Sequence, residues 1–214
     1  MGVITINNSH PAYKYAVGVT TGEIVAPKYV RLQCSEFLQI ARGKNKDYEI
    51  SIQKLQLMED VLGLMIMAKG LKAGQTVKEA MAGFQWLFLT AVLCTVHRKD
   101  PKKRRYQTAI LEICRKNSKT FLCGVLFIIL LLTEPHFSKF YSVAPDGSLS
   151  REVKSAIEEI VKTSPALRSK YKGRDKFRIL RDSIQFVAKE NTYIPLNYSN
   201  STLDGKNLPH LIAI

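Results

Sequence analysis

The feature of this sequence that most constrains its fold is a run of twelve consecutive apolar residues, Phe121 to Leu132. A helix that crosses a bilayer needs about 20 such residues, so this run is too short to span a membrane. It must be buried by other elements instead. The chain has 214 residues and is 46% hydrophobic, which is sufficient for one sizeable core. We therefore expect Thr120–Leu132 to form a core helix.

The segments around this run alternate between strand and helix patterns. Strands are predicted at Arg105–Cys114 and Lys139–Ala144, followed by a turn at Pro145–Gly147 and an amphipathic helix at Ser150–Lys162. Three further short strands are predicted at Ser183–Ala188, Tyr193–Leu196 and Pro209–Ile214, and a turn is predicted at Asp204–Asn207. Alternation of this kind predicts an α/β fold in which flanking helices cover a largely parallel sheet.

The amino-terminal half has a different character. Turn-forming residues dominate the first 25 positions, which we expect to form a loosely docked arm. Apolar spacing then predicts helices at Lys28–Ala41, Ser51–Lys69 and Val77–Val96. The sequence therefore predicts an arm and helical segment over residues 1–97 and an α/β domain over residues 98–214.

The net charge of +14 is confined to two segments. Residues 98–119 contain nine basic and two acidic residues, and residues 162–181 contain eight basic residues and one acidic residue. A single charged run is usually a solvated surface, but two runs that hold the whole excess favour a polyanionic partner such as nucleic acid, or less directly an anionic membrane surface. The candidate DNA-binding residues are Lys102, Lys103, Arg104, Arg105, Lys170, Lys172 and Arg174.

Other classes of function have little support. The four cysteines and four histidines show no paired metal-ligand spacing, so we expect no structural zinc site. The amino terminus has neither the basic and apolar regions of a signal peptide nor a myristoylation signal. Secretion and lipid anchoring are therefore not expected.

A candidate phosphate loop lies between the first predicted strand and the apolar helix. Such loops wrap phosphates with backbone N–H groups at a helix N-terminus, while a Lys contacts the β and γ phosphates and a Ser or Thr hydroxyl reaches magnesium. Lys119 and Thr120 suit those two roles. The two glycine positions of the usual pattern are occupied by Ile113 and Ser118, so spacing alone favours a structural basic turn.

The same stretch resembles a particular family more closely. Large terminase subunits of tailed phages carry a variant phosphate loop of the type Arg-Lys-Asn-Gly-Lys-Ser/Thr, from which Arg115–Thr120 differs mainly at Ser118. The resemblance extends over most of the chain, to Lys28–Leu32 followed by Cys34, the Gly70–Gly74 turn, Gln85 in a Phe-Gln-Trp context, Tyr141–Ala144 and Ser201–Gly205. It implies an ATPase with a P-loop NTPase-like fold.

The resemblance also implies roles for individual residues. Gln85 is expected to contact adenine, Lys119 to bind the phosphates as the catalytic lysine, and Thr120 to bind Mg²⁺. Arg115 and Lys116 would lie at the γ-phosphate, within a nucleotide-binding loop that includes Asn117 and Ser118. The implied cofactors are ATP and Mg²⁺.

At the level of the whole protein, the resemblance implies a motor in the host cytoplasm that packages double-stranded DNA. Its partners would be the small terminase subunit, the portal protein and further copies of itself, with no membrane. The family places two acidic residues directly after the strand equivalent to Leu211–Ile214, and a nuclease domain later; neither is present in this sequence. We therefore expect a partial P-loop ATPase domain that hydrolyses ATP poorly on its own.

Two other interpretations remain open. The chain could be a basic α/β module that binds nucleic acid without catalysis, such as a prophage remnant. A generic helicase-like NTPase would share the phosphate loop but would not explain the amino-terminal matches.

Overall fold

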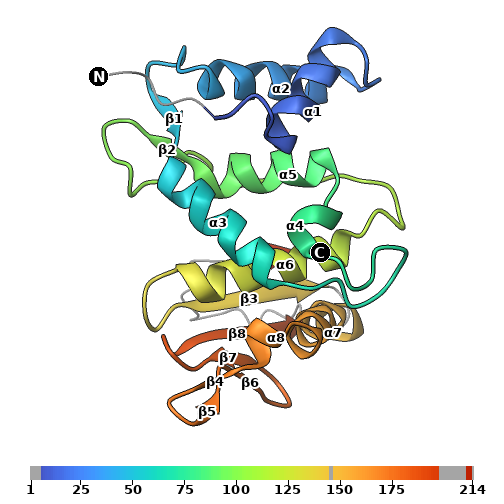
Figure 1. Cartoon of the computed structure of the whole chain (residues 1–214), viewed down its shortest axis with the longest axis vertical. Helices are drawn as coiled ribbons and strands as arrows, with labels where there is room; N and C mark the ends of the chain where they lie inside the picture. The colour runs from blue at the N-terminus through green and yellow to red at the C-terminus, as the bar shows by residue number, and fades with distance from the viewer. Residues whose placement is uncertain (1–5, 145–146, 198–210, 214) are drawn as a thin grey trace. The chain divides into compact units, whose positions relative to one another are not determined.

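The computed structural model describes residues 6–144, 147–197 and 211–213. The chain forms two compact units, which are drawn in Figure 1. Met1–Glu59 and Met81–Glu112 make up the first unit, and Asp60–Ala80 and Ile113–Ile214 make up the second. The chain enters the second unit twice, and the domain division predicted between residues 97 and 98 stays a prediction.

The first unit is mainly helical. It contains α1 (Pro11–Thr21), α2 (Lys28–Ala41), β1 (Tyr48–Ile50), most of α3 (Ile52–Leu64), α5 (Gly83–Leu89), the π-helical turn Thr90–Cys94 and β2 (Thr95–His97). Helix α1 packs against α2 and α5, and β1 pairs antiparallel with β2. Trp86 and Phe37 are among its largest buried side chains.

Helix α1 corrects the expectation of a loose arm. His10 caps the helix, since its Nδ1 accepts a hydrogen bond from the Ala12 N–H at 3.2 Å, and Pro11 occupies the first turn. Gly22, at φ 87°, ends the helix in the left-handed region. The buried residues Ala12 and Ala16 lie on the face that packs into the unit.

The helix predicted at Val77–Val96 is also corrected. It is divided into α4 (Val77–Ala80), α5 and the π-helical turn, and its last residues form strand β2 instead. Residues Thr95–His97 form a strand because they pair with β1, with Ile50 opposite Thr95. This pairing satisfies backbone N–H and C=O groups that would otherwise be bonded within a longer helix.

The second unit is built around a mixed five-stranded sheet in the order β6-β7-β8-β3-β9. Its strands are β3 (Lys139–Ala144), β6 (Phe177–Ile179), β7 (Ile184–Phe186), β8 (Asn191–Asn197) and β9 (Leu211–Ala213). The α/β class is confirmed. The largely parallel sheet is not, because β3 is parallel to β8 and β9 but β7 is antiparallel to β6 and β8. Short turns join β6, β7 and β8, and turns that short allow only antiparallel pairing.

Helices α6 (Lys119–Thr133) and α7 (Gly147–Thr163) pack on each other and on β8. The apolar run lies in α6, where Val125, Phe127 and Ile128 are fully buried, so the predicted core helix is confirmed. Helix α8 (Pro165–Arg168) and the small hairpin of β4 (Lys170–Tyr171) and β5 (Arg174–Asp175) follow α7. The predicted turn at residues 204–207 lies outside the described residues.

The strand predicted at Arg105–Cys114 is absent from the structure. Residues 106–114 are irregular and largely exposed, and Ile110 retains 88% of its accessible surface. A strand requires a neighbour that satisfies its backbone N–H and C=O groups. Among the described residues, pairing stops at the start of the predicted strand: Arg104 forms an isolated bridge to Val96, and the Arg105 N–H donates to the Thr95 carbonyl at 2.9 Å.

Candidate functional site

The residues predicted to bind phosphate form an exposed loop that leads into α6. Lys116 has a φ of 67° and Ser118 a φ of 60°, so two residues of the loop adopt the left-handed conformation. The side-chain amide of Asn117 donates to the Cys114 and Arg115 carbonyl oxygens, at 3.3 and 3.4 Å. Turns with left-handed residues direct successive backbone N–H groups to one side, which favours anions.

Helix α6 adds its own dipole to this loop. Ser118 is the residue that precedes the helix, and its carbonyl oxygen accepts a hydrogen bond from the Leu122 N–H at 2.9 Å. Its hydroxyl forms no capping hydrogen bond, so the first N–H groups of α6 remain available to a ligand. Lys119 and Thr120 are the first two residues of the helix. Arg115, Lys116 and Lys119 supply positive charge, and residues 113–123 contain no carboxylate.

The sheet places this loop at the edge where ligands commonly bind. The carboxyl end of α6 is tied to the start of β8, because the Asn191 amide donates to the Leu131 carbonyl at 3.0 Å and the Lys189 ammonium donates to the Glu134 carbonyl at 2.9 Å. The amino end of α6 therefore points toward the carboxyl ends of the parallel strands β3 and β8. Open α/β sheets bind their ligands at this edge.

The side chains fit ATP and Mg²⁺ in part. The loop and Lys119 suit a phosphate chain, and the Thr120 hydroxyl suits one position on a magnesium ion. Among the described residues there is no group of three or more His, Cys, Asp or Glu side chains that could hold a metal ion. Magnesium keeps several waters and binds through substrate phosphates in such sites, so Thr120 and the nucleotide would provide its ligands here.

Gln85 belongs to the first unit, whereas the loop belongs to the second. Gln85 is 7% exposed, and its Oε1 accepts a hydrogen bond from the Ala82 N–H at 2.9 Å at the start of α5. This capping contact orients the amide, and no hydrogen bond occupies its Nε2 within the described structure. The role of Gln85 in adenine binding stays a prediction.

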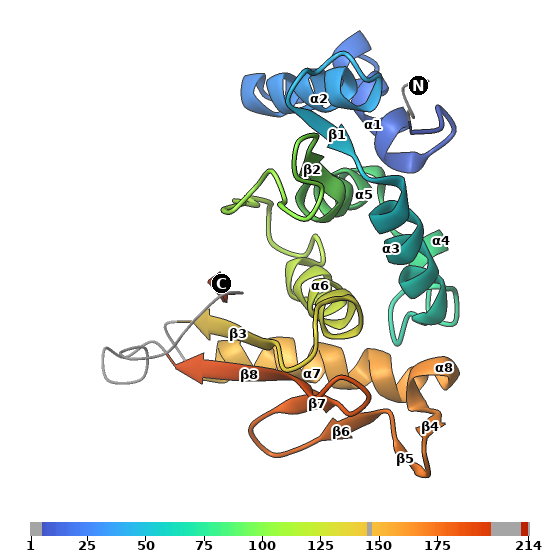
Figure 2. The same ribbon diagram turned by 90° about the vertical axis from the view of Figure 1, so that its left-hand side faces the viewer.

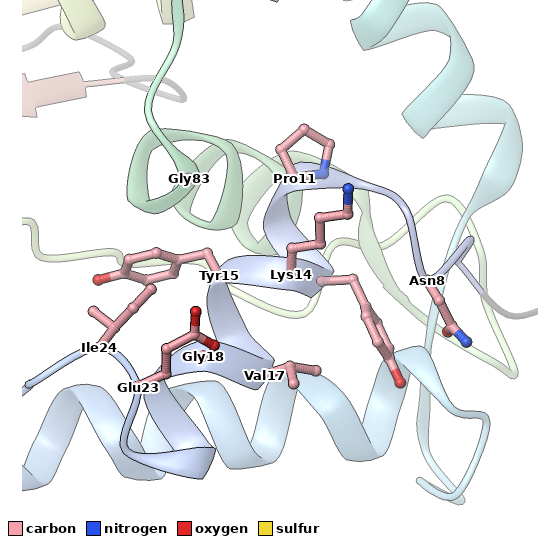
Figure 3. A pocket seen from close by; sticks show the side chains of 10 residues that line it. Asn8, Pro11, Lys14, Tyr15, Val17, Gly18, Glu23, Ile24 and Gly83 are labelled. Carbon is pink, nitrogen blue, oxygen red and sulfur yellow. The ribbon is translucent and has the colours of Figure 1, made fainter.

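The first unit contains a pocket of about 630 Å³ that no residue pattern predicted, shown in Figure 3. Lys14, Tyr15, Glu23, Ile24 and Gly83 are among its lining residues. Gly83 approaches Tyr15 so closely that a Cβ at position 83 would lie 2.8 Å from the Tyr15 Cβ. The pocket lies beside α1, the helix that replaced the predicted arm, which is why residue patterns could not reveal it.

Two arginines of the first basic segment are held by ion pairs within the first unit. Arg98 forms an ion pair with Glu49 at 2.9 Å, and Arg105 forms an ion pair with Glu36. The Arg105 guanidinium also stacks on the rings of Tyr48 and Tyr106. Arg104 is half-buried, and the exposed cations of the turn are Lys99, Lys102 and Lys103.

The second basic segment presents its charges differently. Lys170, Lys172 and Arg174 lie on the β4–β5 hairpin and are exposed. None of the three forms an ion pair with a carboxylate in the described part of the chain. The structure thus separates cations that stabilise the fold from cations that are open to a partner.

The architecture resembles that of one known structure, although no sequence comparison gives a match. No protein-family profile and no curated protein sequence matches the chain. Among solved structures, the large terminase of bacteriophage HK97 matches with a TM-score of 0.57 and 19% sequence identity, over 75% of this chain. The chain has the fold of part of a phage large terminase. It spans 30% of the length of that terminase. No helix among the described residues is long and apolar enough to cross a membrane.

Proposed function

We propose that this chain is the ATP-binding portion of a terminase large subunit, a motor that drives double-stranded DNA into a phage capsid. The observation that carries the proposal is the loop of residues 115–118, which has two left-handed residues and leads directly into α6, in a fold shared with a large terminase. A basic loop at that position suits the phosphates of a nucleotide.

The residues of the loop have distinct roles in this proposal. Lys119 neutralises the β and γ phosphates and is the catalytic lysine, while the Thr120 hydroxyl binds Mg²⁺. Arg115 and Lys116 contact the γ-phosphate, and the backbone of Asn117 and Ser118 wraps the phosphate chain. Gln85 contacts adenine through its amide N–H groups. Mg²⁺ would offset the charge of the phosphates when bound.

The proposed partners follow from the terminase resemblance. They are duplex DNA, the small terminase subunit, the portal protein and further copies of the complete subunit, in the host cytoplasm. Hydrolysis also needs a group that orients the attacking water. We assign none of the described residues to that task, so nucleotide binding is the activity to measure in this chain.

The decisive experiment is calorimetric titration of the chain with a non-hydrolysable ATP analogue and Mg²⁺. Saturable binding is expected, with a loss of at least about tenfold in affinity in Lys119→Ala because a lysine on phosphate is worth about 1.4 kcal/mol or more. Lys139→Ala is the matched control, since Lys139 is exposed at the opposite end of β3. Absence of binding in the unaltered chain would overturn the proposal and favour the non-catalytic basic module.

A further inference from the structure

The β4–β5 hairpin is a small, exposed ribbon with a well-defined turn. Lys170 pairs with Asp175 and Tyr171 with Arg174 in antiparallel register. The two turn residues, Lys172 at φ 49° and Gly173 at φ 79°, are both left-handed, as in a type I′ turn. All six residues are exposed, and the hairpin projects from the second unit in Figures 1 and 2.

The base of the hairpin is fixed to its unit. The Lys176 N–H donates to the Ser169 carbonyl at 3.2 Å, and the Lys176 ammonium donates to the Ala166 carbonyl at 3.1 Å. On the other side, the Val187 N–H donates to the Lys176 carbonyl at 2.9 Å. These contacts join the ribbon to α8 and to β7, so the hairpin holds its charges in a set position.

The two faces of the ribbon differ in charge. Residues directly opposite each other in a ladder share a face, and faces alternate along a strand. Asp175 therefore balances Lys170 on one face. The other face carries Tyr171 and Arg174, with the Lys172 ammonium 5.5 Å from the centre of the Tyr171 ring. This second face has two cations, one aromatic ring and no carboxylate.

A ribbon of this form suits duplex DNA better than other polyanions. The major groove admits a two-stranded β-ribbon, and Lys and Arg side chains bind the phosphates along it. An anionic membrane would require several apolar side chains, whereas the hairpin offers only Tyr171. A single-stranded nucleic acid would require successive aromatic platforms, and the hairpin has one.

We propose that the β4–β5 hairpin is a DNA-contacting element, in which Lys172 and Arg174 bind duplex phosphates and Tyr171 packs against the backbone between them. The choice of duplex DNA rests on the proposed packaging function. Helix α7 runs from the carboxyl edge of the sheet to α8 and the hairpin and is 17 residues long, or about 25 Å. The hairpin therefore lies at the far end of α7 from the carboxyl edge of the sheet, toward which the amino end of α6 points. The loss of DNA binding and the loss of nucleotide binding can be measured separately.

The test is the salt dependence of binding to a 30-base-pair duplex of arbitrary sequence. Each phosphate contact contributes about 0.9 to the slope of log K against log salt. The double variant Lys172→Gln with Arg174→Gln is expected to reduce that slope by about 1.8 and to weaken binding at least about tenfold at low salt. The exchange Lys172→Arg with Arg174→Lys keeps both charges and should retain the slope.

The matched control is Lys99→Gln with Lys102→Gln, which removes two exposed lysines from the other basic segment. An equal or larger loss of slope in this control would overturn the proposal, as would unchanged binding in the hairpin variant. Preference for a 30-nucleotide single strand over the duplex, abolished by Tyr171→Ala, would overturn the choice of duplex.

ATP-analogue binding by the same variants separates this proposal from the proposed function. Hairpin variants that fold, as judged by circular dichroism, should bind the analogue like the unaltered chain. Nucleotide binding without any hairpin-dependent DNA binding would remove the hairpin proposal alone. DNA binding that depends on the hairpin, in a chain that does not bind the ATP analogue, would support the hairpin proposal and overturn the proposed motor function.

Discussion

Ser118 occupies a position that glycine holds in a standard phosphate loop. The sequence raised the question whether a side chain can occupy a position that glycine usually holds. The structure shows Ser118 at φ 60° and ψ 32°, so the loop keeps the conformation that glycine prefers and adopts it with a side chain. A left-handed conformation costs a residue with a Cβ about 1 kcal/mol or more. The loop shape is therefore compatible with Ser118, at some cost in stability.

Replacing Ser118 with glycine should relieve this cost. We expect Ser118→Gly to raise the free energy of unfolding by about 0.5–1 kcal/mol and to bind the ATP analogue at least as tightly, because the loop reaches the same shape without strain. Urea unfolding and calorimetry measure the two effects. Ser118→Ala is the control, since it keeps the Cβ and should show neither gain. A glycine variant that unfolds earlier than the alanine variant would contradict this explanation.

Cys94 gives the first unit a dependence on alkaline pH. Burial, opposed by the charges of Arg104 and Lys54, raises the pKa of the Cys94 thiol from 9.0 to about 12. Because the pKa is raised in the folded state, the stabilisation is complete below pH 9 and is lost as pH rises toward 12. The expected slope is about 1.4 kcal/mol per pH unit for this one thiol.

The variant Cys94→Ala isolates that contribution. Urea unfolding of both proteins at pH 8, 9 and 10 should give curves that converge above pH 9, because the variant lacks the thiol and loses less stability. The difference in free energy of unfolding between the two proteins at pH 8 reports the cost of the cavity that alanine leaves. Parallel curves from pH 8 to pH 10 would show that the thiol ionises equally in both states.

At the scale of elements, a buried network of hydroxyl groups joins α7 to the sheet. The Ser142 and Tyr193 hydroxyls lie 2.7 Å apart, and the Ser150 hydroxyl donates to the Leu196 carbonyl at 2.8 Å. These residues come from β3, β8 and α7 and are buried. The network satisfies polar groups that water cannot reach, and it fixes the start of α7 at the carboxyl edge of the sheet.

Removal of one hydroxyl from this network should be costly. We expect Tyr193→Phe to lower the free energy of unfolding by about 1–2 kcal/mol, because the Ser142 hydroxyl loses its closest partner. The control is Tyr29→Phe, where the ring is 80% exposed and the change should be within about 0.5 kcal/mol. Thermal or urea unfolding measures the stability of both variants. Equal stability of Tyr193→Phe and Tyr29→Phe would mean that the hydroxyl network contributes nothing to the free energy of unfolding.

Elements with strong local signals could be predicted from the sequence. The pattern of Lys28–Ala41 gave the bounds of α2, and that of Lys139–Ala144 gave those of β3. The apolar run gave α6 to within a residue at each end. In each case one periodic pattern decides the buried face.

The sequence predictions failed where the structure of a segment depends on packing or pairing with distant parts of the chain, which a local residue pattern does not reveal. Pro11 and Gly22 are the start and stop signals of helix α1, but both counted among the turn formers of the first 25 residues, which suggested an arm. The alternation in residues 106–114 suggested a strand, yet the described structure provides no neighbouring ladder for it. For the site, the sequence predicted that Lys119 and Thr120 lie at the start of the apolar helix, and they do, whereas their roles toward phosphate and Mg²⁺ stay predictions. The φ of Ser118, and the division of the basic residues into ion-paired and open ones, depend on the folded backbone.

At the scale of the whole molecule, the dominant property is the net charge of +14 and its concentration in two segments. Like charges within a Debye length, about 10 Å at 0.1 M salt, repel each other and oppose folding. Lys99, Lys102 and Lys103 lie on one exposed turn with a single carboxylate, Asp100, whose Oδ1 accepts a hydrogen bond from the Lys102 N–H at 3.2 Å. The turn keeps a net positive charge, and its lysines take no part in the ion pairs that hold Arg98 and Arg105. The exposed lysines of this turn therefore destabilise the free protein.

This repulsion predicts how salt affects stability. The thermal midpoint should rise by a few degrees between about 20 and 200 mM NaCl, because the Debye length shortens over that range. The triple variant Lys99→Gln, Lys102→Gln and Lys103→Gln should be more stable at low salt and should respond less to added salt. Scanning calorimetry of both proteins measures this, with Lys69→Gln as the opposite control because Lys69 pairs with Glu159 at 2.8 Å. A midpoint that is independent of salt in the unaltered chain would mean that the lysines are too well solvated to repel one another, and that their clustering costs the fold nothing.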